Sequence, residues 1–241
     1  MKRFFLFLML PLLAITFNSC SDDDDNNGNN GDSGKLVKSI VEGNMVSTFE
    51  YDSQNRLTKS IHKEDGRQDV FNTFTYENNK LAYTLTDLNN PEENGTIVLY
   101  FDDAGYLINI DDEGYYDTFT YVGGYLNRTV GSLGYTQSFT WNNGNITSIT
   151  SSDGYEWAYD YSDIANSLNI RSGIFPHEWF LVSPKSKGVH SEQFPSSCKE
   201  YKNGTLQSTI AYSYTLDNDG YLTQITVTEN GSEEKILITY Y

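Results

Sequence analysis

Cysteine is almost absent from this chain of 241 residues, which contains only Cys20 and Cys198. A framework of disulfide bonds is therefore excluded. No activating charge pattern surrounds Cys198. We expect this residue to be a buried, small hydrophobic side chain rather than a reactive thiol.

Histidine and the common catalytic motifs are equally scarce. The three histidines are His62, His177 and His190. They form no H-x-x-x-H or H-E-x-x-H arrangement. No G-x-S-x-G motif is present. Acidic pairs could supply the two carboxylates of a glycosidase, for example Asp102 with Asp103 or Asp217 with Asp219, but these residues also suit hairpin turns. We therefore expect a non-enzymatic protein without catalytic residues, cofactor or metal.

Basic residues are few, with 16 Lys and Arg against 33 Asp and Glu, and the formal net charge is −17. Such a charge repels phosphate groups. The composition therefore argues against nucleic acid and against anionic lipid headgroups as partners.

The chain has one long hydrophobic run, at residues 4–15, directly after Lys2 and Arg3. Twelve residues are too few to span a bilayer about 30 Å thick at 1.5 Å per residue, so the run is typical of a signal peptide. A small residue, Ser19, precedes Cys20. We predict a lipoprotein signal peptide at residues 1–19, with Cys20 acylated and holding the protein to a membrane. The alternative is an ordinary secretory peptide with an incidental cysteine.

Residues 20–34 contain a run of acidic residues and then Asn and Gly, with no apolar residue that could build a core. We predict a flexible tether. Its first residues are Ser21, Asp22, Asp23, Asp24 and Asp25. They resemble the export signal of Bacteroidota lipoproteins, and this resemblance implies transfer across the outer membrane to the cell surface. A calcium-binding role for the acidic run is the weaker reading.

Residues 35–241 repeat one unit, in which an aromatic or apolar anchor is followed by a polar turn and then by Leu or Ile. The seven units are 51–57, 76–81, 101–107, 121–126, 141–146, 201–206 and 216–222. Asn-Gly and Asp-Gly turns favour tight hairpins. The flanking residues alternate between aromatic and Thr or Ser side chains, as in half-buried strands.

The pattern predicts an all-β domain, an antiparallel meander of about 14–16 short strands with aromatic side chains inside and a hydroxyl-rich outside. A sheet of this many strands tends to curl, so we expect a barrel or a strongly curved half-barrel. Strands of five to seven residues are short for a barrel embedded in lipid, which needs about 9–11 residues per strand. A sheet outside the membrane is therefore favoured.

The units resemble the YD (RHS-type) repeats of secreted shell-forming proteins. The arrangement from signal peptide to C-terminus also resembles a family of Bacteroidota surface lipoproteins with a porin-like β fold. The resemblance implies hairpins and a location, and it supplies no catalytic residues. Several units lack the Tyr-Asp pair, among them the one that begins Tyr121-Val122.

A non-repeat insertion is expected at about residues 162–198, with a short helix at 163–168. Its most apolar part, 172–184, contains Trp179. Pro176 and Pro184 lie within this part and Pro195 lies just beyond it, and this spacing of prolines excludes a central strand. We expect 172–184 to be a core plug or, alternatively, the wall of a ligand pocket.

Two functions remain open, a surface module that binds a glycan or a protein and a scaffold whose aromatic residues are all core. Binding would require aromatic side chains outside the core. The candidates are the loop residues Tyr106, Tyr115, Tyr125 and Trp179. A cluster of two or more exposed aromatic residues beside polar groups would favour the binding module.

Overall fold

The computed structural model describes residues 35–67, 69–166 and 188–241. Within these ranges the chain forms sixteen β-strands and one short 3₁₀ helix, η1 (Pro91–Glu93). The strands are β1 (Val37–Glu42), β2 (Met45–Tyr51), β3 (Leu57–Glu64), β4 (Val70–Glu77), β5 (Lys80–Asp87), β6 (Gly95–Phe101), β7 (Leu107–Asp112), β8 (Tyr115–Val122), β9 (Tyr125–Gly131), β10 (Thr136–Asn142), β11 (Asn145–Ser151), β12 (Tyr155–Ala165), β13 (Gln193–Lys202), β14 (Thr205–Leu216), β15 (Leu222–Glu229) and β16 (Ser232–Tyr240).

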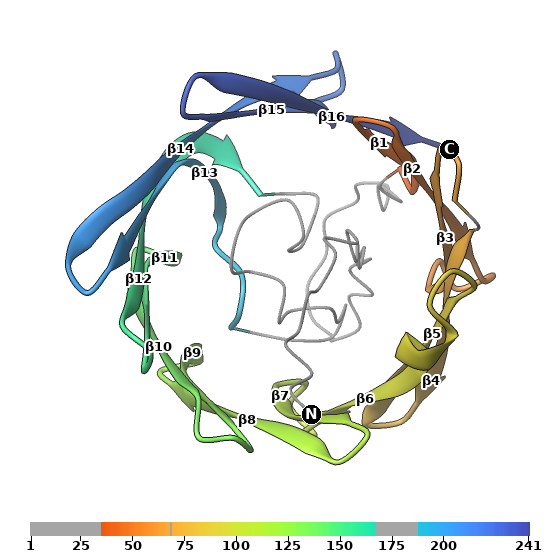
Figure 1. The fold of residues 1–241 in the computed structure, drawn as a ribbon, viewed down its shortest axis with the longest axis horizontal. Helices are drawn as coiled ribbons and strands as arrows, with labels where there is room; N and C mark the ends of the chain where they lie inside the picture. The colour runs from red at the N-terminus through yellow and green to blue at the C-terminus, as the bar shows by residue number, and fades with distance from the viewer. Residues whose placement is uncertain (1–34, 68, 167–187) are drawn as a thin grey trace, which may run out of the picture.

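The strands form a closed antiparallel barrel (Figure 1). Each strand pairs with its neighbours in sequence, and β1 closes the ring by pairing with β16, where Ile40 lies opposite Ile238. The predicted all-β antiparallel meander is confirmed. The number of strands is at the upper end of the expected range, and the sheet is a closed barrel. Closure gives both edge strands a partner, so no row of backbone groups is left unpaired at a sheet edge.

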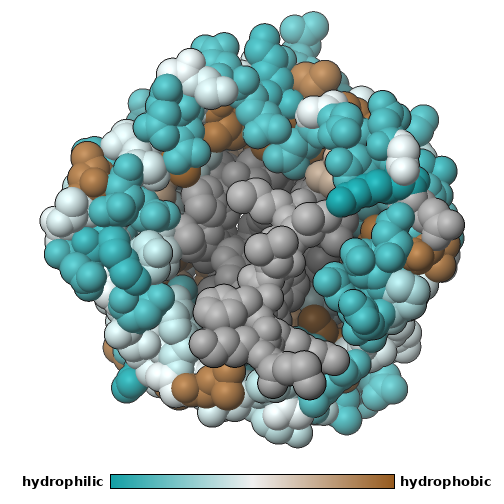
Figure 2. Space-filling view, in the orientation of Figure 1, coloured by the Kyte–Doolittle hydropathy of each residue, from teal (hydrophilic) through white to brown (hydrophobic). Residues whose placement is uncertain are grey.

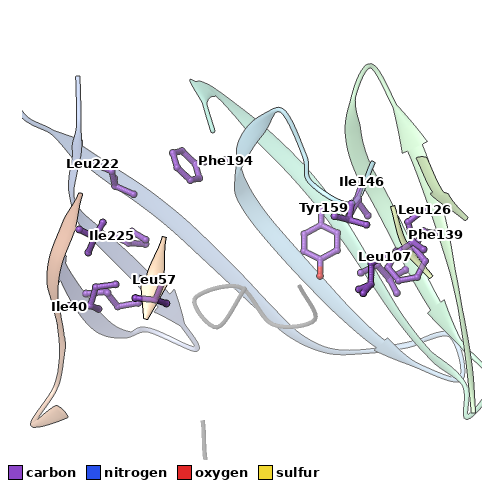
Figure 3. Packing of buried hydrophobic residues seen from close by; sticks show 14 of the residues in the cluster. Ile40, Leu57, Leu107, Leu126, Phe139, Ile146, Tyr159, Phe194, Leu222 and Ile225 are labelled. Carbon is purple, nitrogen blue, oxygen red and sulfur yellow. The ribbon is translucent and has the colours of Figure 1, made fainter. Parts of the chain in front are cut away.

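The two faces of the wall differ as the alternating pattern predicts. Inward side chains are buried, as in Phe49 and Leu99, each 1% exposed, and Figure 3 shows the buried Leu, Ile and aromatic side chains along the wall. Outward positions are largely Thr, Ser and charged residues, for example Thr73, Thr118 and Thr140. Seen down the barrel, the surface is mostly hydrophilic with scattered hydrophobic residues (Figure 2).

The strands are longer than expected, and some enter the predicted insertion. Most have six to eight residues, but β12, β13 and β14 have 11, 10 and 12. Because β12 continues to Ala165 and β13 begins at Gln193, the boundaries 162 and 198 were wrong at both ends. Residues 163–165 are strand, so the short helix expected there is wrong.

Pro195 was expected to lie outside the sheet but is inside β13, opposite Tyr161. The register shifts on both sides of Tyr161, which marks an irregular stretch of the ladder. Proline lacks a backbone N–H and is tolerated in strands at such irregularities. The segment 172–184, including Trp179, lies outside the described residues.

The barrel has two rims, which we name by their turns. The entry rim, where β1 begins, consists of turns 52–56, 78–79, 102–106, 123–124, 143–144 and 217–221. The far rim consists of turns 43–44, 65–69, 88–94, 113–114, 132–135, 152–154, 203–204 and 230–231. Among residues 35–67, 69–166 and 188–241, the groups outside the barrel wall belong mostly to these turns and to residues 188–192 at the entry rim.

Candidate functional site

The seven sequence units are hairpins, and six of them lie at the entry rim. In every unit the anchor residue pairs with the Leu or Ile that ends the unit, for example Tyr121 with Leu126. The seventh unit, 201–206, lies at the far rim because β13 descends to that rim after the long connection from β12. The repeat therefore encodes the hairpins and most of one rim, and no chemistry is required to explain it.

The first aspartate of the five-residue turns has a structural role. Oδ1 of Asp102 accepts hydrogen bonds from the N–H groups of Ala104 and Tyr106 at 3.0 and 2.9 Å. Asp52 and Asp217 make the same pair of bonds in their own turns. The bond from the Tyr221 N–H holds the pKa of Asp217 below its usual range. The carboxylates of Asp52, Asp102 and Asp217 therefore shape their turns, as their positions in the sequence suggest.

Many of the aromatic anchors are also structural. The polar tip of each donates to the carbonyl of the Leu, Ile or equivalent residue that begins a neighbouring strand on the ring. The bonds are Tyr51 to Val37 at 2.8 Å, Tyr121 to Leu107 at 2.9 Å, Trp141 to Leu126 at 2.6 Å, Tyr161 to Ile146 at 2.5 Å and Tyr240 to Leu222 at 2.7 Å. Burial raises the pKa of Tyr121, so its hydroxyl stays protonated and remains a donor. These aromatic side chains are not available to stack on a ligand.

A short segment, residues 188–192, crosses the entry rim and is called the strap here. The Gly188 carbonyl accepts from the Leu126 N–H at 2.7 Å, and the Glu192 N–H donates to the Gly144 carbonyl at 3.1 Å. Ser191 is 3% exposed, and its Oγ accepts from the Ile146 N–H at 3.0 Å. The strap therefore covers turns 123–124 and 143–144.

Two of the four aromatic residues proposed as ligand contacts pack beside this strap. The Tyr106 ring lies 4.8 Å from that of Tyr121, and the Tyr125 ring lies 4.9 Å from that of Trp141. Tyr125 is 37% exposed. Both belong to the entry rim, whereas Tyr115 lies at the far rim, so the structure does not bring the proposed contacts together. Trp179, Cys20 and the Ser21–Asp25 run lie outside the described residues.

The far rim carries three exposed tyrosines, of which only Tyr115 was proposed from the sequence as a ligand contact. Tyr115 is 53%, Tyr116 47% and Tyr135 36% exposed, and Leu133 between them is 79% exposed. Backbone and side-chain bonds between Tyr116 and Ser132 join the strand to the neighbouring turn. We call these four residues the tyrosine patch. The adjacent pair Tyr115–Tyr116 could have indicated an exposed tyrosine from the sequence, because neighbouring strand residues point to opposite faces and one of the two must face outward.

Polar groups adjoin the tyrosine patch. Gln137 Nε2 donates to the Tyr135 hydroxyl at 3.3 Å, and Asp117 lies in the strand that begins at Tyr115. Burial raises the pKa of Asp117, and it also raises the pKa of Asp112 nearby. Exposed aromatic side chains and polar groups thus occur along one stretch of the far rim, with Tyr116 facing outward and Tyr115 on the face of β8 that carries the buried Phe119.

A buried polar cluster on the inner wall was not foreseen from the sequence. Ser47 Oγ lies 2.8 Å from Nδ1 of His62, and Ser60 Oγ and Asn72 Nδ2 each lie 3.1 Å from Nε2. All four residues are at most 3% exposed. Burial lowers the pKa of His62 to about 4, so the ring is neutral near pH 7. The cluster resembles a Ser–His pair by distance, but among the described residues no carboxylate is bonded to His62 to complete a triad.

Cys198 is buried, as expected. In the parts of the chain that the structure describes, no group of three His, Cys, Asp or Glu side chains could hold a metal ion. None of the helices in those same parts is long and apolar enough to cross a membrane.

The fold has relatives among solved structures. A porin-like protein from Bacteroides uniformis ATCC 8492 superposes with a TM-score of 0.59 at 18% identity, over 85% of this chain and 95% of that one. A porin-like protein from Bacteroides vulgatus ATCC 8482 gives a TM-score of 0.57 at 13% identity, over 86% and 99%. No protein-family model and no curated protein matches the sequence. At these identities the similarity establishes the closed barrel fold that this chain shares with porin-like proteins.

Proposed function

We propose that the mature protein is a non-enzymatic binding module at the outer membrane, held by acylated Cys20 and exposed on the cell surface. The observation that carries this proposal is the polarity of the barrel wall. Charged side chains point outward from the middle of several strands, among them Arg128, Asp160 and Lys235, all exposed to solvent. A charged side chain facing lipid at mid-membrane costs about 2–4 kcal/mol for Arg or Lys. Such a wall suits a barrel that stands outside the bilayer and is held there by an anchor.

The position of the tether would orient the barrel. Lys35 lies at the entry rim, where its Nζ contacts Asp219 at 2.7 Å and Asp217 at 3.2 Å. The fifteen residues 20–34 reach at most about 50 Å when fully extended. Because the tether joins the barrel at the entry rim, we infer that this rim is the one nearer the membrane and that the far rim with its tyrosine patch is directed toward the surroundings.

The tyrosine patch favours binding over a purely structural role. Tyrosine offers a large apolar surface and a polar tip at low entropic cost, and it stacks on sugars and anchors protein partners equally well. The competing scaffold function is supported by the entry-rim aromatic side chains that bond to neighbouring backbone carbonyls, such as Tyr51, Tyr121 and Trp141. Because the four patch residues are exposed instead, a glycan or protein ligand at the far rim is the better explanation.

The anchoring is tested by replacing residues 1–20 with a secretory signal peptide that is cleaved without acylation. A barrel held only by Cys20 should then move from the outer membrane to the soluble periplasmic fraction. Recovery of the unacylated protein in the outer-membrane fraction, resistant to carbonate extraction, would mean that the wall itself enters lipid.

Surface export is tested by replacing Asp22–Asp25 with alanine. We expect the variant to be acylated as before but to stay on the periplasmic side, protected from protease added to whole cells. Equal digestion of variant and parent would contradict a role for these aspartates in export.

Binding is tested with the full mature chain, purified in a detergent that carries no sugar and applied to a glycan array. Tyr116→Ala together with Tyr135→Ala should reduce binding at least tenfold, while Tyr125→Ala at the entry rim serves as the matched control. If the parent binds no glycan, surface cross-linking on cells then tests for a protein ligand at the same patch. Failure of both experiments would favour the scaffold function.

A further inference from the structure

The turns of the entry rim differ in length, and this leaves one gap. Turns 52–56, 102–106 and 217–221 have five residues, whereas 78–79, 123–124 and 143–144 have two. The strap covers 123–124 and 143–144. The short turn 78–79 lies between the long turns 52–56 and 102–106, because β4 and β5 lie between β3 and β6 in the ring. We call the resulting recess the notch.

The notch contains two hollows, one on each side of the short turn 78–79. One side has a volume of about 520 Å³ and is lined by Arg56, Tyr76, Glu77, Asn78, Asn79 and Asp103. The other side, about 460 Å³, adds Lys80, Tyr100, Phe101 and Ile108. Volumes of this size lie within the range of small-molecule sites, about 300–1,000 Å³.

The polar groups of the notch are fixed before any ligand arrives. The Arg56 guanidinium donates from Nε to Asp52 Oδ2 at 2.7 Å and lies 4.9 Å from the centre of the Tyr76 ring. On the opposite side, Asn79 Nδ2 donates to Asp103 Oδ1 at 2.8 Å, and the Phe101 N–H donates to the Asn79 carbonyl at 2.9 Å. Groups held in this way lose little freedom on binding, which is the condition for recognition by a shallow site.

The lining selects one class of ligand. The first side offers donors and acceptors together, with the guanidinium of Arg56, two side-chain amides and the carboxylates of Glu77 and Asp103. A phosphate would meet both carboxylates, and a cation would meet Arg56. The second side is mainly apolar, and Ile108 there is 42% exposed. Hydroxyl groups beside an apolar C–H face are the chemistry of a neutral sugar.

We propose that the notch binds a neutral oligosaccharide that crosses the rim, with Asp103, Asn79 and Arg56 bonded to the hydroxyls of one part and the outward-facing Tyr100 and Ile108 against the C–H face of another. This inference rests on the proposed binding function but places the sugar at the membrane-proximal rim, away from the tyrosine patch. A sugar chain would thus be held close to the surface of the membrane.

The experiment is ligand-observed saturation-transfer NMR on the full mature acylated chain in a detergent without sugar. The neutral probes are maltohexaose, cellohexaose and xylohexaose, and an oligogalacturonate is the charged probe. We expect at least one neutral probe to bind and the oligogalacturonate to bind at least tenfold more weakly. Asp103→Asn, which removes an acceptor charge at constant shape, and Asn78→Trp, which fills the hollow, should each weaken binding at least tenfold.

The matched control is Asp65→Asn, which removes the same charge from an exposed turn of the far rim and should leave affinity unchanged. Thermal unfolding of each variant establishes that the barrel is intact. Binding lost on Tyr116→Ala but retained in both notch variants would overturn the notch and leave the binding function standing. Absence of binding by all three neutral probes, or stronger binding of the oligogalacturonate, would also overturn this inference. The proposed membrane anchoring is tested separately by the fractionation experiment.

Discussion

The buried His62 makes the stability of the barrel depend on pH in a predictable direction. Burial lowers the pKa of His62 to about 4 in the folded protein, from 6.5 for an unperturbed imidazole. Near pH 7 the ring is neutral in both states and the shift has no effect. Below about pH 6.5 the imidazole is protonated in the unfolded chain, whereas in the folded protein it stays neutral until about pH 4. The free energy of unfolding therefore falls as the pH falls across that window.

The size of the effect follows from the shift. Each unit of pKa difference corresponds to about 1.4 kcal/mol, so His62 should cost the folded state about 3 kcal/mol at pH 4 relative to pH 7. A typical domain has only about 5–15 kcal/mol of stability, so this loss is large. The loss arises because His62 is 3% exposed and its ring nitrogens contact only neutral polar groups among the described residues, so no nearby charge offsets the cost of burying an imidazolium.

Urea unfolding at pH 7, 6, 5 and 4 measures this dependence in the parent and in His62→Gln. The variant should be less stable at pH 7, because it loses hydrogen bonds inside the cluster, but its stability should fall less steeply toward pH 4. Carboxyl groups titrate in the same window, yet they are identical in both proteins and cancel in the difference. A difference in unfolding free energy that stays constant from pH 7 to pH 4 would refute the buried neutral histidine.

Three further predictions concern the entry rim and Cys198. Gly188→Ala should destabilise the barrel by about 1–3 kcal/mol in urea unfolding, because Gly188 has a φ of +69° and an added Cβ would collide with the backbone of turn 123–124. Tyr121→Phe leaves the buried Leu107 carbonyl without its partner and should cost about 1–3 kcal/mol, whereas Tyr116→Phe on the surface should change the melting curve little. Cys198, at 1% exposure, should react with an alkylating reagent only as fast as the barrel opens; rapid labelling of native protein would contradict this.

The sequence predicts the wall of this barrel well because each part of the wall is encoded locally. Alternation with a period of two fixes which side chains face inward, and turn chemistry fixes where each hairpin reverses. Phe49 and Leu57 illustrate this, since both belong to a local pattern and both are buried. Closure was not predicted, because the local pattern fits a half-barrel equally well and only the pairing of β1 with β16 distinguishes the two.

The sites are poorly predicted because they depend on residues far apart in the chain. Gly188 bonds to Leu126, and Gln193 bonds to Asn145, across separations that no local pattern records. The buried cluster brings together Ser47, His62 and Asn72 from three strands, and each one alone looks like an ordinary polar residue. Pro195 was misread for the same reason, since only the partner strand shows that its position is irregular.

The rim positions that the hairpins leave accessible are therefore the ones that bear on the proposed function. In some units the aromatic anchor bonds to a neighbouring carbonyl and the aspartate shapes the turn. These side chains stabilise the barrel itself. The notch arises where a two-residue turn follows a five-residue turn, and the tyrosine patch where two adjacent tyrosines occupy a strand that elsewhere alternates with Thr. Neither feature is needed to close the ring. Both leave polar and aromatic groups accessible at opposite ends of it, so a ligand is more readily explained at the rims than along the wall.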